Sequence, residues 1–284
     1  MGIYAVTGAA SGMGRAVTDR LRSAGHTVVG VDIKESDVVA DLSTPGGRQQ
    51  AVREVLKIAG GGRLDGAVLA AGIGPAPGRD RPRLIAEVNY FGVVDLLDGW
   101  RSALASAGKA KVVVFSSNST TTTPAVPGRM IKALLDGGDA DRAVRSVRLF
   151  GKGAPGIAYG GSKIAVSRWV RRNAVRPEWA GSGIRLNALA PGAIMTPLLE
   201  KQLATPAEAK VIHSFPVPAG GFGDAGQLGD WAVFMLSDAA DFLCGSIVFV
   251  DGGSDAYFRS DDWPRSVPVR RIVRYLRRFR EFGR

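Results

Sequence analysis

The chain has 284 residues, 45% hydrophobic and 22% charged, with two histidines and one cysteine, Cys244. This composition is typical of a globular protein and excludes an internal disulfide. It fits a reducing compartment, which predicts a cytoplasmic protein, and it leaves little material for a metal site. More than half of the +11 net charge lies in residues 259–284, where nine arginines and three acidic residues give +6; we expect no nucleic-acid partner.

Apolar runs and helical periodicity alternate along the chain. Six strands are predicted at residues 3–7, 28–32, 66–70, 111–115, 184–188 and 246–250. Helices are predicted between them, near residues 15–24, 47–58, 83–104, 159–179 and 226–236. Alternating strands and helices are typical of a parallel sheet covered on both faces. The sequence therefore predicts an α/β protein, a Rossmann-like doubly wound parallel sheet in one domain over residues 1–258.

Two segments interrupt this alternation. Residues 119–155 contain the helix-like stretch 129–149 and look like a helical insertion. Residues 259–284 form an arginine-rich C-terminal extension. No apolar run approaches the roughly 18 residues that a membrane span requires.

A glycine-rich turn joins the first strand to the first helix. It contains Gly8, Ser11, Gly12, Met13 and Gly14, where a dinucleotide-binding loop has to lie. Glycines allow a tight turn and a close approach of backbone N–H groups to a pyrophosphate, and the helix N-terminus favours the anion. A glycine triplet alone is a weak signal, and a turn without a ligand is the alternative.

Asp32 ends the second strand, about 18 residues after the glycine loop. A carboxylate at this spacing accepts hydrogen bonds from the adenosine ribose and repels a 2′-phosphate. The loop has no Arg or Lys to offset that repulsion, so NAD is predicted over NADP, although Lys34 lies two residues away. Asp41 and Leu42 either approach the adenine edge or form a turn before the next helix.

Tyr159 and Lys163 are four residues apart and share a helix face. A positive charge about 4 Å away is worth roughly three pKa units at an effective dielectric near 20. We therefore expect Lys163, together with an oxidised nicotinamide, to lower the phenol pKa, making Tyr159 the acid in reduction and the base in oxidation. An exposed Tyr-Lys pair is the alternative.

Two polar residues complete a candidate catalytic set. Ser117 follows the strand 111–115, at the edge where open α/β sheets bind ligands, and its hydroxyl would orient a substrate oxygen. Asn89 is an amide within an otherwise apolar helical stretch, and would hold a water that passes protons to Lys163. For both, a hydrogen bond to nearby backbone is the alternative.

In this order, the motifs resemble those of classical short-chain dehydrogenases/reductases over about residues 2–257. The resemblance implies a catalytic set of Asn89, Ser117, Tyr159 and Lys163, with Thr196 at the nicotinamide carboxamide. One position departs, because the family's frequent Asn-Ala-Gly reads Ala70-Ala71-Gly72 here. Together the motifs and the resemblance assign cofactor contacts to Gly8, Ser11, Gly12, Met13, Gly14, Asp32, Ile33, Asp41, Leu42, Ala71, Gly72, Tyr159, Lys163, Pro191, Gly192, Ile194 and Thr196.

Within the family, the chain is similar to bacterial 3α-hydroxysteroid dehydrogenase/carbonyl reductases. The matching stretches include 25–33, 39–44, 88–92 and 188–193, and the 42-residue separation of Ser117 from Tyr159 matches a helical insertion found in that group. The resemblance implies a homodimer, with the family's common tetramer as the alternative. It implies hydride transfer between NAD and a secondary alcohol or ketone. An NAD-binding regulator without turnover is the rival function.

The resemblance places a mobile substrate lid at residues 198–223. Its apolar residues suit an apolar alcohol or ketone such as a steroid: Leu198, Leu199, Val211, Ile212 and Phe215. In the C-terminal extension, apolar residues from Val269 to Phe279 share one helical face and five arginines the other. Such a helix would lie on an anionic membrane or dock on a partner subunit, and both alternatives stay open.

Overall fold

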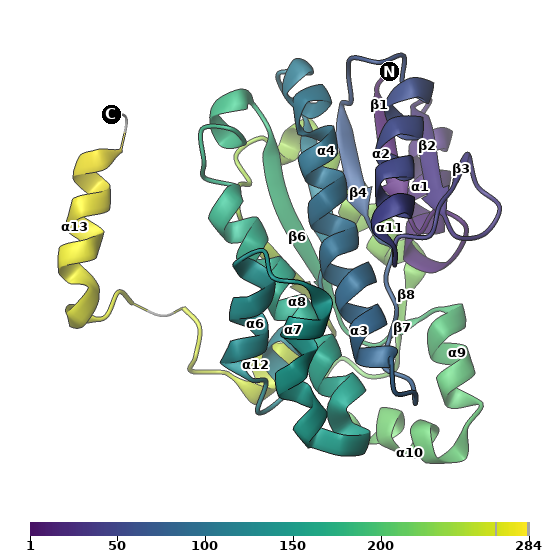
Figure 1. The fold of residues 1–284 in the computed structure, drawn as a ribbon, viewed down its shortest axis with the longest axis vertical. Helices are drawn as coiled ribbons and strands as arrows, with labels where there is room; N and C mark the ends of the chain where they lie inside the picture. Colours follow the sequence, from purple (N-terminus) through teal and green to yellow (C-terminus); the bar gives the residue numbers. More distant parts are fainter. Residues whose placement is uncertain (265, 283–284) are drawn as a thin grey trace.

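In the computed structural model, which describes residues 1–264 and 266–282, seven parallel strands form the central sheet (Figure 1). The strands are β1 (Ile3–Thr7), β2 (Thr27–Asp32), β3 (Val38–Val39), β4 (Gly66–Leu69), β5 (Lys111–Phe115), β6 (Arg185–Pro191) and β9 (Ile247–Val250). Their order is β3-β2-β1-β4-β5-β6-β9. The order reverses direction between β1 and β4, and such a switch point opens a crevice at the carboxyl ends of the strands. Six side chains are not described, those of Leu198, Lys201, Gln202, Ala207, Glu208 and Val211.

Helices cover both faces of the sheet, and the predicted Rossmann-like fold is confirmed. One face carries α2 (Pro45–Ile58), α4 (Gly92–Ser106) and α8 (Ala154–Asn173). The other carries α1 (Gly12–Ser23) and α11 (Ala225–Leu236). Both faces are thus shielded from water, which explains why the strands read as continuous apolar runs.

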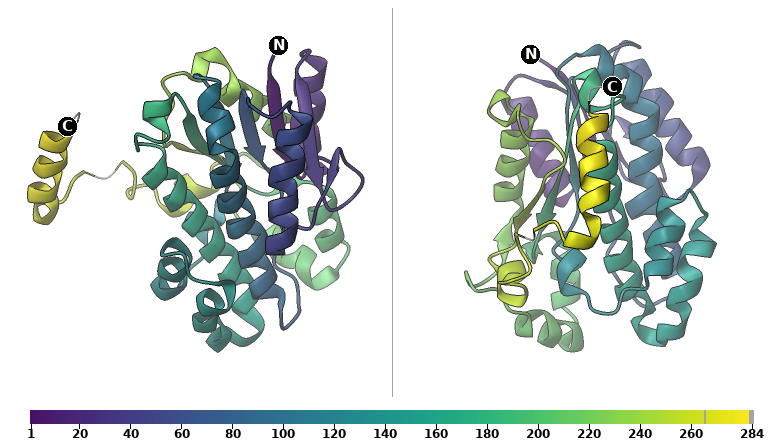
Figure 2. Two further views of the ribbon diagram at one scale, coloured as in Figure 1. Left: turned by 45° about the horizontal axis from the view of Figure 1, so that its top comes forward. Right: turned by 90° about the vertical axis from the view of Figure 1, so that its left-hand side faces the viewer.

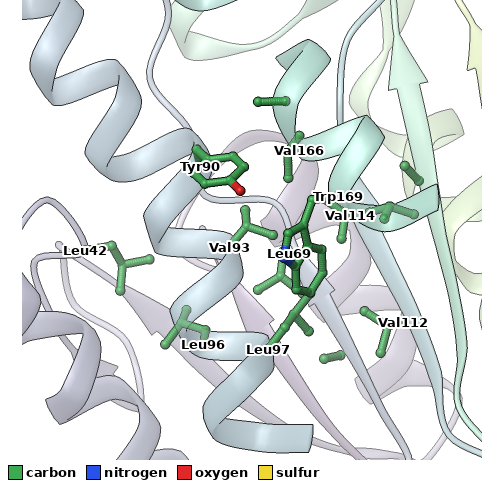
Figure 3. Close-up of a cluster of buried hydrophobic side chains, with 14 of the residues drawn as sticks. Leu42, Leu69, Tyr90, Val93, Leu96, Leu97, Val112, Val114, Val166 and Trp169 are labelled. Carbon is green, nitrogen blue, oxygen red and sulfur yellow. The ribbon is translucent and has the colours of Figure 1, made fainter. Parts of the chain in front are cut away.

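Strand β5 shows how one apolar run serves both faces. Val112 and Val114 pack with the α4 and α8 side chains, whereas Val113 and Phe115 pack with those of α1 and α11. Successive side chains of a strand point to opposite faces, so four consecutive apolar residues fill two cores. Figure 3 shows the first core, in which Trp169 of α8 lies near the two valines.

The predicted elements agree with the structure, with two informative differences. The long helix predicted near 83–104 is three segments, α3 (Arg81–Ala86), a π-helical turn η1 (Glu87–Phe91) and α4. The helix predicted to end near residue 179 ends at Asn173 instead. Pro177 has no N–H to donate to the Asn173 carbonyl, so the α-helix cannot continue through it.

The segment between β5 and α8 is helical, in agreement with the sequence. It contains α5 (Ser119–Thr122), α6 (Gly128–Leu135), α7 (Ala140–Val144) and the 3-10 turn η2 (Arg145–Gly153). Met130, Ile131 and Leu134 of α6 are buried in the first core. These helices therefore extend the domain, and their status as an insertion stays a prediction.

The remaining elements lie at the carboxyl edge of the sheet and beyond it. Helices α9 (Pro197–Leu203) and α10 (Pro206–Ser214) occupy the proposed lid, flanked by a short parallel pair, β7 (Ile194–Met195) and β8 (Gly223–Asp224). The chain then passes α12 (Ser254–Phe258) and the turn η5 (Val269–Arg271) to α13 (Ile272–Glu281). Figures 1 and 2 show α13 standing apart from the sheet and its covering helices. In the described part of the chain, none of the helices combines the length and apolar character needed to cross a bilayer.

Candidate active site

The glycine loop after β1 is folded tightly against the sheet. Gly8 and Gly12 have φ angles of +71° and +55°, which favour glycine. A Cβ on Gly14 would lie 2.2 Å from the Gly8 carbonyl oxygen, and Thr7 Oγ1 accepts a 3.0 Å hydrogen bond from the Ala71 N–H. The loop therefore needs glycine for its conformation and for close packing of α1.

The loop borders a cavity of about 300 Å³ at the switch point of the sheet. Twelve predicted cofactor contacts line it: Gly8, Ser11, Gly12, Met13, Gly14, Asp32, Ile33, Asp41, Leu42, Ala71, Gly72 and Thr196. Residues from five separate segments of the chain thus meet around one space. This space, beside a helix N-terminus and a fixed carboxylate, fits a dinucleotide.

Two backbone N–H groups hold the Asp32 carboxylate at the cavity. Oδ2 accepts a 3.0 Å hydrogen bond from Ala10 and Oδ1 accepts one of 3.0 Å from Lys34. Lys34 thus contributes a backbone donor that steadies the carboxylate. Asp41 combines the two alternatives left by the sequence, because it lines the cavity while Oδ1 accepts a 2.9 Å hydrogen bond from the Ser43 N–H.

Tyr159 and Lys163 lie one turn apart on α8, as their spacing predicts. Lys163 is buried and Tyr159 is half-buried, and Lys163 Nζ lies 5.9 Å from the Tyr159 ring centroid. Burial lowers the pKa of the Lys163 ammonium to about 8, because a charge is poorly solvated there. The exposed-pair alternative is therefore wrong.

The Tyr159 phenol and the Ser117 hydroxyl line the same wall of the second cavity described below. Burial raises the pKa of Tyr159 above its ordinary value, and the hydrogen bond with Ser117 opposes that rise. In the structure without cofactor, desolvation of the phenolate thus outweighs the contact with Ser117. The lowering expected from Lys163 together with an oxidised nicotinamide stays a prediction.

Asn89 lies in the π-helical turn and contacts the segment after β4. Its Oδ1 accepts a 2.9 Å hydrogen bond from the Ile73 N–H, and its Nδ2 donates one of 3.0 Å to the Ile73 carbonyl. A Cβ built on Gly72 would lie 3.3 Å from Asn89 Oδ1 and 3.8 Å from Lys163 Nζ. The backbone-bonded alternative thus describes Asn89, and the same contacts bring its amide close to Lys163.

A buried ion pair fixes the start of the π-helical turn. Arg48 of α2 donates to Glu87 at 2.9 Å and to the Leu42 carbonyl at 3.1 Å. The Arg48 guanidinium also lies 5.8 Å from the Phe91 ring centroid. Arg48 thereby connects Leu42, which lines the first cavity, to the turn that carries Asn89. Sequence reasoning missed this role, because Arg48 reads as one polar residue of an amphipathic helix.

A second cavity of about 670 Å³ adjoins the first, and Met13 and Thr196 line both. Ser117 and Tyr159 form part of its wall. Pro191, Gly192 and Ile194, predicted as cofactor contacts, line this second cavity instead. They follow β6 at the junction of the two spaces, where the loop passes close to Asp251; a Cβ on Gly192 would lie 2.7 Å from its Cα.

The second cavity has a polar wall and an apolar wall. The apolar wall includes these residues: Phe150, Ile157, Leu199, Ile212 and Phe215. The side chains of Leu198 and Val211, also predicted for the substrate, lie outside those described. The polar wall contains Asn118, Ser119, Thr122 and Thr123.

Two groups of the polar wall are buried without a partner. Asn118 Nδ2 and Ser119 Oγ have no hydrogen-bond partner among the described residues. The signal that could have found them is the unbroken polar run 116–123, which the sequence analysis treated as the start of the insertion.

The chain is 36% identical over 262 residues to the 3-alpha-hydroxysteroid dehydrogenase/carbonyl reductase of Comamonas testosteroni. The match covers 91% of this chain and 98% of the relative. The chain belongs to the short-chain dehydrogenase/reductase family. It is also 30% identical over 270 residues to the coniferyl-alcohol dehydrogenase of Pseudomonas sp. strain HR199, with 87% of this chain and 94% of the relative covered.

Family models and solved structures agree with this membership. Residues 144–255 match an enoyl-(acyl carrier protein) reductase model and residues 4–186 match the NAD dependent epimerase/dehydratase family. The crystal structure of the 3-alpha-hydroxysteroid dehydrogenase from Pseudomonas sp. B-0831, complexed with NADH, superposes with a TM-score of 0.84 at 42% identity. That superposition covers 91% of this chain and 99% of the other, so about a tenth of this short-chain dehydrogenase/reductase has no counterpart there.

Proposed function

We propose that this short-chain dehydrogenase/reductase transfers a hydride reversibly between NAD(H) and the alcohol or ketone carbon of an apolar substrate such as a hydroxysteroid. The observation that carries the proposal is that Tyr159 and Ser117 lie together in the wall of the second cavity, which adjoins the first. Similarity to dehydrogenases supports an oxidoreductase over the rival NAD-binding regulator.

The first cavity is proposed to hold the dinucleotide. Asp32 would accept hydrogen bonds from the adenosine ribose, and its charge would repel the 2′-phosphate of NADP. The glycine loop would bring backbone N–H groups and the positive end of α1 to the pyrophosphate. When bound, the nicotinamide supplies or accepts the hydride.

The catalytic residues are proposed to handle the substrate oxygen and its proton. In reduction, Tyr159 Oη donates its proton to the carbonyl oxygen while Ser117 Oγ donates a hydrogen bond to it; in oxidation, Tyr159 takes the hydroxyl proton. Lys163 favours the phenolate through its positive charge. Asn89 keeps one amide N–H beyond its bond to Ile73, and that donor is free to hold a water near Lys163.

The substrate is proposed to be an apolar alcohol or ketone. The apolar wall of the second cavity, from Leu199 to Phe215, supports this class, and helices α9 and α10 are proposed to act as a lid. The test is the absorbance of reduced nicotinamide with NAD or NADP and a panel of 3-hydroxysteroids and simple secondary alcohols. We expect turnover with NAD and a hydroxysteroid.

Tyr159→Phe provides the matched control for that assay. It should lose turnover by about 10²–10⁴-fold while NADH binding, measured by fluorescence, is retained. Wild-type turnover in this variant would contradict the assigned roles. NAD binding without turnover of any substrate in the panel would favour the regulator instead.

We also propose that the protein is a cytoplasmic homodimer. The 42-residue separation of Ser117 from Tyr159 resembles that of the 3α-hydroxysteroid dehydrogenase/carbonyl reductase group, and this resemblance supports a dimer. The single cysteine supports a reducing compartment. Sedimentation equilibrium should give twice the chain mass, and a tetramer would contradict the proposed assembly. Cell fractionation tests the compartment.

A further inference from the structure

Helix α13 presents its whole circumference to the surroundings. In Figure 1 and in the left view of Figure 2 it stands apart from the sheet and its helices, and it follows α12 along the chain. All ten of its residues are exposed, including Phe279 at 76%.

The two faces of α13 differ in chemistry. Ile272, Leu276 and Phe279 recur at helical spacing and share one face. Arg274 and Arg278 lie on the opposite face. The helix is therefore strongly amphipathic, yet its apolar side chains are exposed and are not packed into the core of the described residues.

A helix of this kind needs a surface to lie on. Isolated helices shorter than about 12–15 residues are marginal in water, and like charges four residues apart destabilise them further. Arg270, Arg274 and Arg278 form such a series, offset by one ion pair of opposite sign, Arg277 with Glu281 at 3.4 Å. A surface that is apolar and negatively charged would stabilise both faces at once.

Charge favours an anionic surface over a second copy of this chain. Residues 259–284 carry +6 of the +11 net charge, so residues 1–258 still carry +5. A partner subunit would present a net positive body to a positive helix. An anionic lipid surface attracts each arginine.

Nucleic acid would contact only the basic face of the helix. Phosphates would pair with the arginines but leave Ile272, Leu276 and Phe279 in water. A phospholipid surface takes up both faces, because its headgroups carry charge and its acyl boundary accepts apolar side chains.

We propose that α13 lies in the interface of an anionic phospholipid membrane and holds the enzyme there. The apolar face sinks to the acyl boundary and the arginines contact the headgroup phosphates. The contact is peripheral, since the helix is far too short to span.

The helix that leads into the tail lies next to the second cavity. Phe258, the last residue of α12, packs against Phe215 with ring centroids 5.8 Å apart, and Phe215 lines that cavity. Helix α12 also contacts α5, the helix of the polar wall. Membrane contact through the tail therefore keeps the cavity near the lipid, where an apolar alcohol or ketone would concentrate. This last step rests on the proposed function, whereas lipid binding does not.

The test is co-sedimentation of the full-length protein with phosphatidylcholine vesicles, with and without phosphatidylglycerol. We expect binding only when the anionic lipid is present. The triple variants Arg274→Gln/Arg277→Gln/Arg278→Gln and Ile272→Asn/Leu276→Asn/Phe279→Asn should each lose about a hundredfold in vesicle affinity. Turnover of a water-soluble ketone should be unchanged in both.

Matched controls alter the same residue types on the body. Arg53→Gln/Arg148→Gln/Arg168→Gln removes three exposed arginines, and Val175→Asn/Phe242→Asn removes two exposed apolar side chains. Both should bind vesicles as wild type does. The proposal is overturned if wild type stays unbound, if the tail variants bind equally well, or if they change only oligomeric mass or affinity for a DNA duplex. Vesicle binding needs no turnover, so its failure is distinct from failure of the proposed activity.

Discussion

Lys163 Nζ donates a 2.7 Å hydrogen bond to the main-chain oxygen of Phe115, the last residue of β5. The contact ties α8, which carries Tyr159, to the strand that leads directly to Ser117. It also gives a buried ammonium one of the acceptors that it needs. Lys163 therefore contributes to the geometry of the site as well as to its charge.

The first prediction concerns the pH dependence of stability. The folded state lowers the Lys163 pKa to about 8 from 10.5, so the unfolded state binds more protons between these values. The free energy of unfolding of wild type, relative to Lys163→Met, should therefore rise with pH across this window, by up to about 3 kcal/mol. Urea unfolding at several pH values measures it. The control is Lys57→Met, which removes an exposed ammonium. The free energy of unfolding of wild type relative to Lys57→Met should not rise in this way across the window. Parallel curves for wild type and Lys163→Met would refute the burial argument.

The second prediction concerns Ser117. Its hydrogen bond lowers the Tyr159 pKa against the effect of burial. Ser117→Ala should therefore raise that pKa, so alcohol oxidation, which needs the phenolate, should begin at higher pH. The kcat should also fall, because the substrate oxygen loses a donor. The pH profile of kcat in both directions checks this. Ser119→Ala, on the same wall, should leave the profile in place.

The third prediction concerns cofactor choice. Asp32→Asn should remove the charge that repels a 2′-phosphate while its amide oxygen keeps one of the two backbone hydrogen bonds, from Ala10 or from Lys34; its NH2 group cannot accept the other. The ratio of NADP to NAD in kcat/KM should rise roughly tenfold to a hundredfold. Asp41→Asn is the matched control, since its carboxylate sits at a turn before α2, and should alter both cofactors alike. An unchanged ratio in Asp32→Asn would remove the basis for NAD preference.

The fourth prediction concerns Asn118. Its amide is buried without a described partner, a state that costs about 1–3 kcal/mol. Asn118→Leu should therefore raise the free energy of unfolding by about 1–3 kcal/mol. It should also raise KM, because the amide N–H is expected to donate a hydrogen bond to a second oxygen of the substrate. Asn173→Leu, which removes a buried amide bonded to the Trp169 carbonyl, should instead destabilise the protein. A destabilised Asn118→Leu would show that the amide has a structural role.

Much of this fold follows from local patterns. The run 111–115 is β5 residue for residue, and the four residues after Lys111 are apolar because that part of the strand is covered on both faces. The glycine loop and Asp32 meet at one cavity because parallel strands end at the same edge. The order of motifs thus sufficed for the first cavity.

The rest depends on enclosure, which a sequence does not reveal. The direction in which the Tyr159 pKa is shifted depends on how far the surrounding protein shields the phenol from water. The polar wall around Asn118 reads as loop sequence until the fold places it in one cavity with Leu199, Ile212 and Phe215. The roles of the catalytic and cofactor residues, like the domain limits, stay predictions for the experiments above.

The π-helical turn at Glu87–Phe91 shows what the placement of a single amide demands of the chain. A π turn is in effect one extra residue in an α-helix, with poorer hydrogen bonding than the helix around it. A chain shorter by one residue there would run unbroken from α3 into α4, but Asn89 would be rotated by about 100° relative to α4 and would leave the Ile73 backbone. A single-residue deletion within the π turn should thus displace Asn89 relative to α4, so the extra residue of this turn is a functional constraint in its own right.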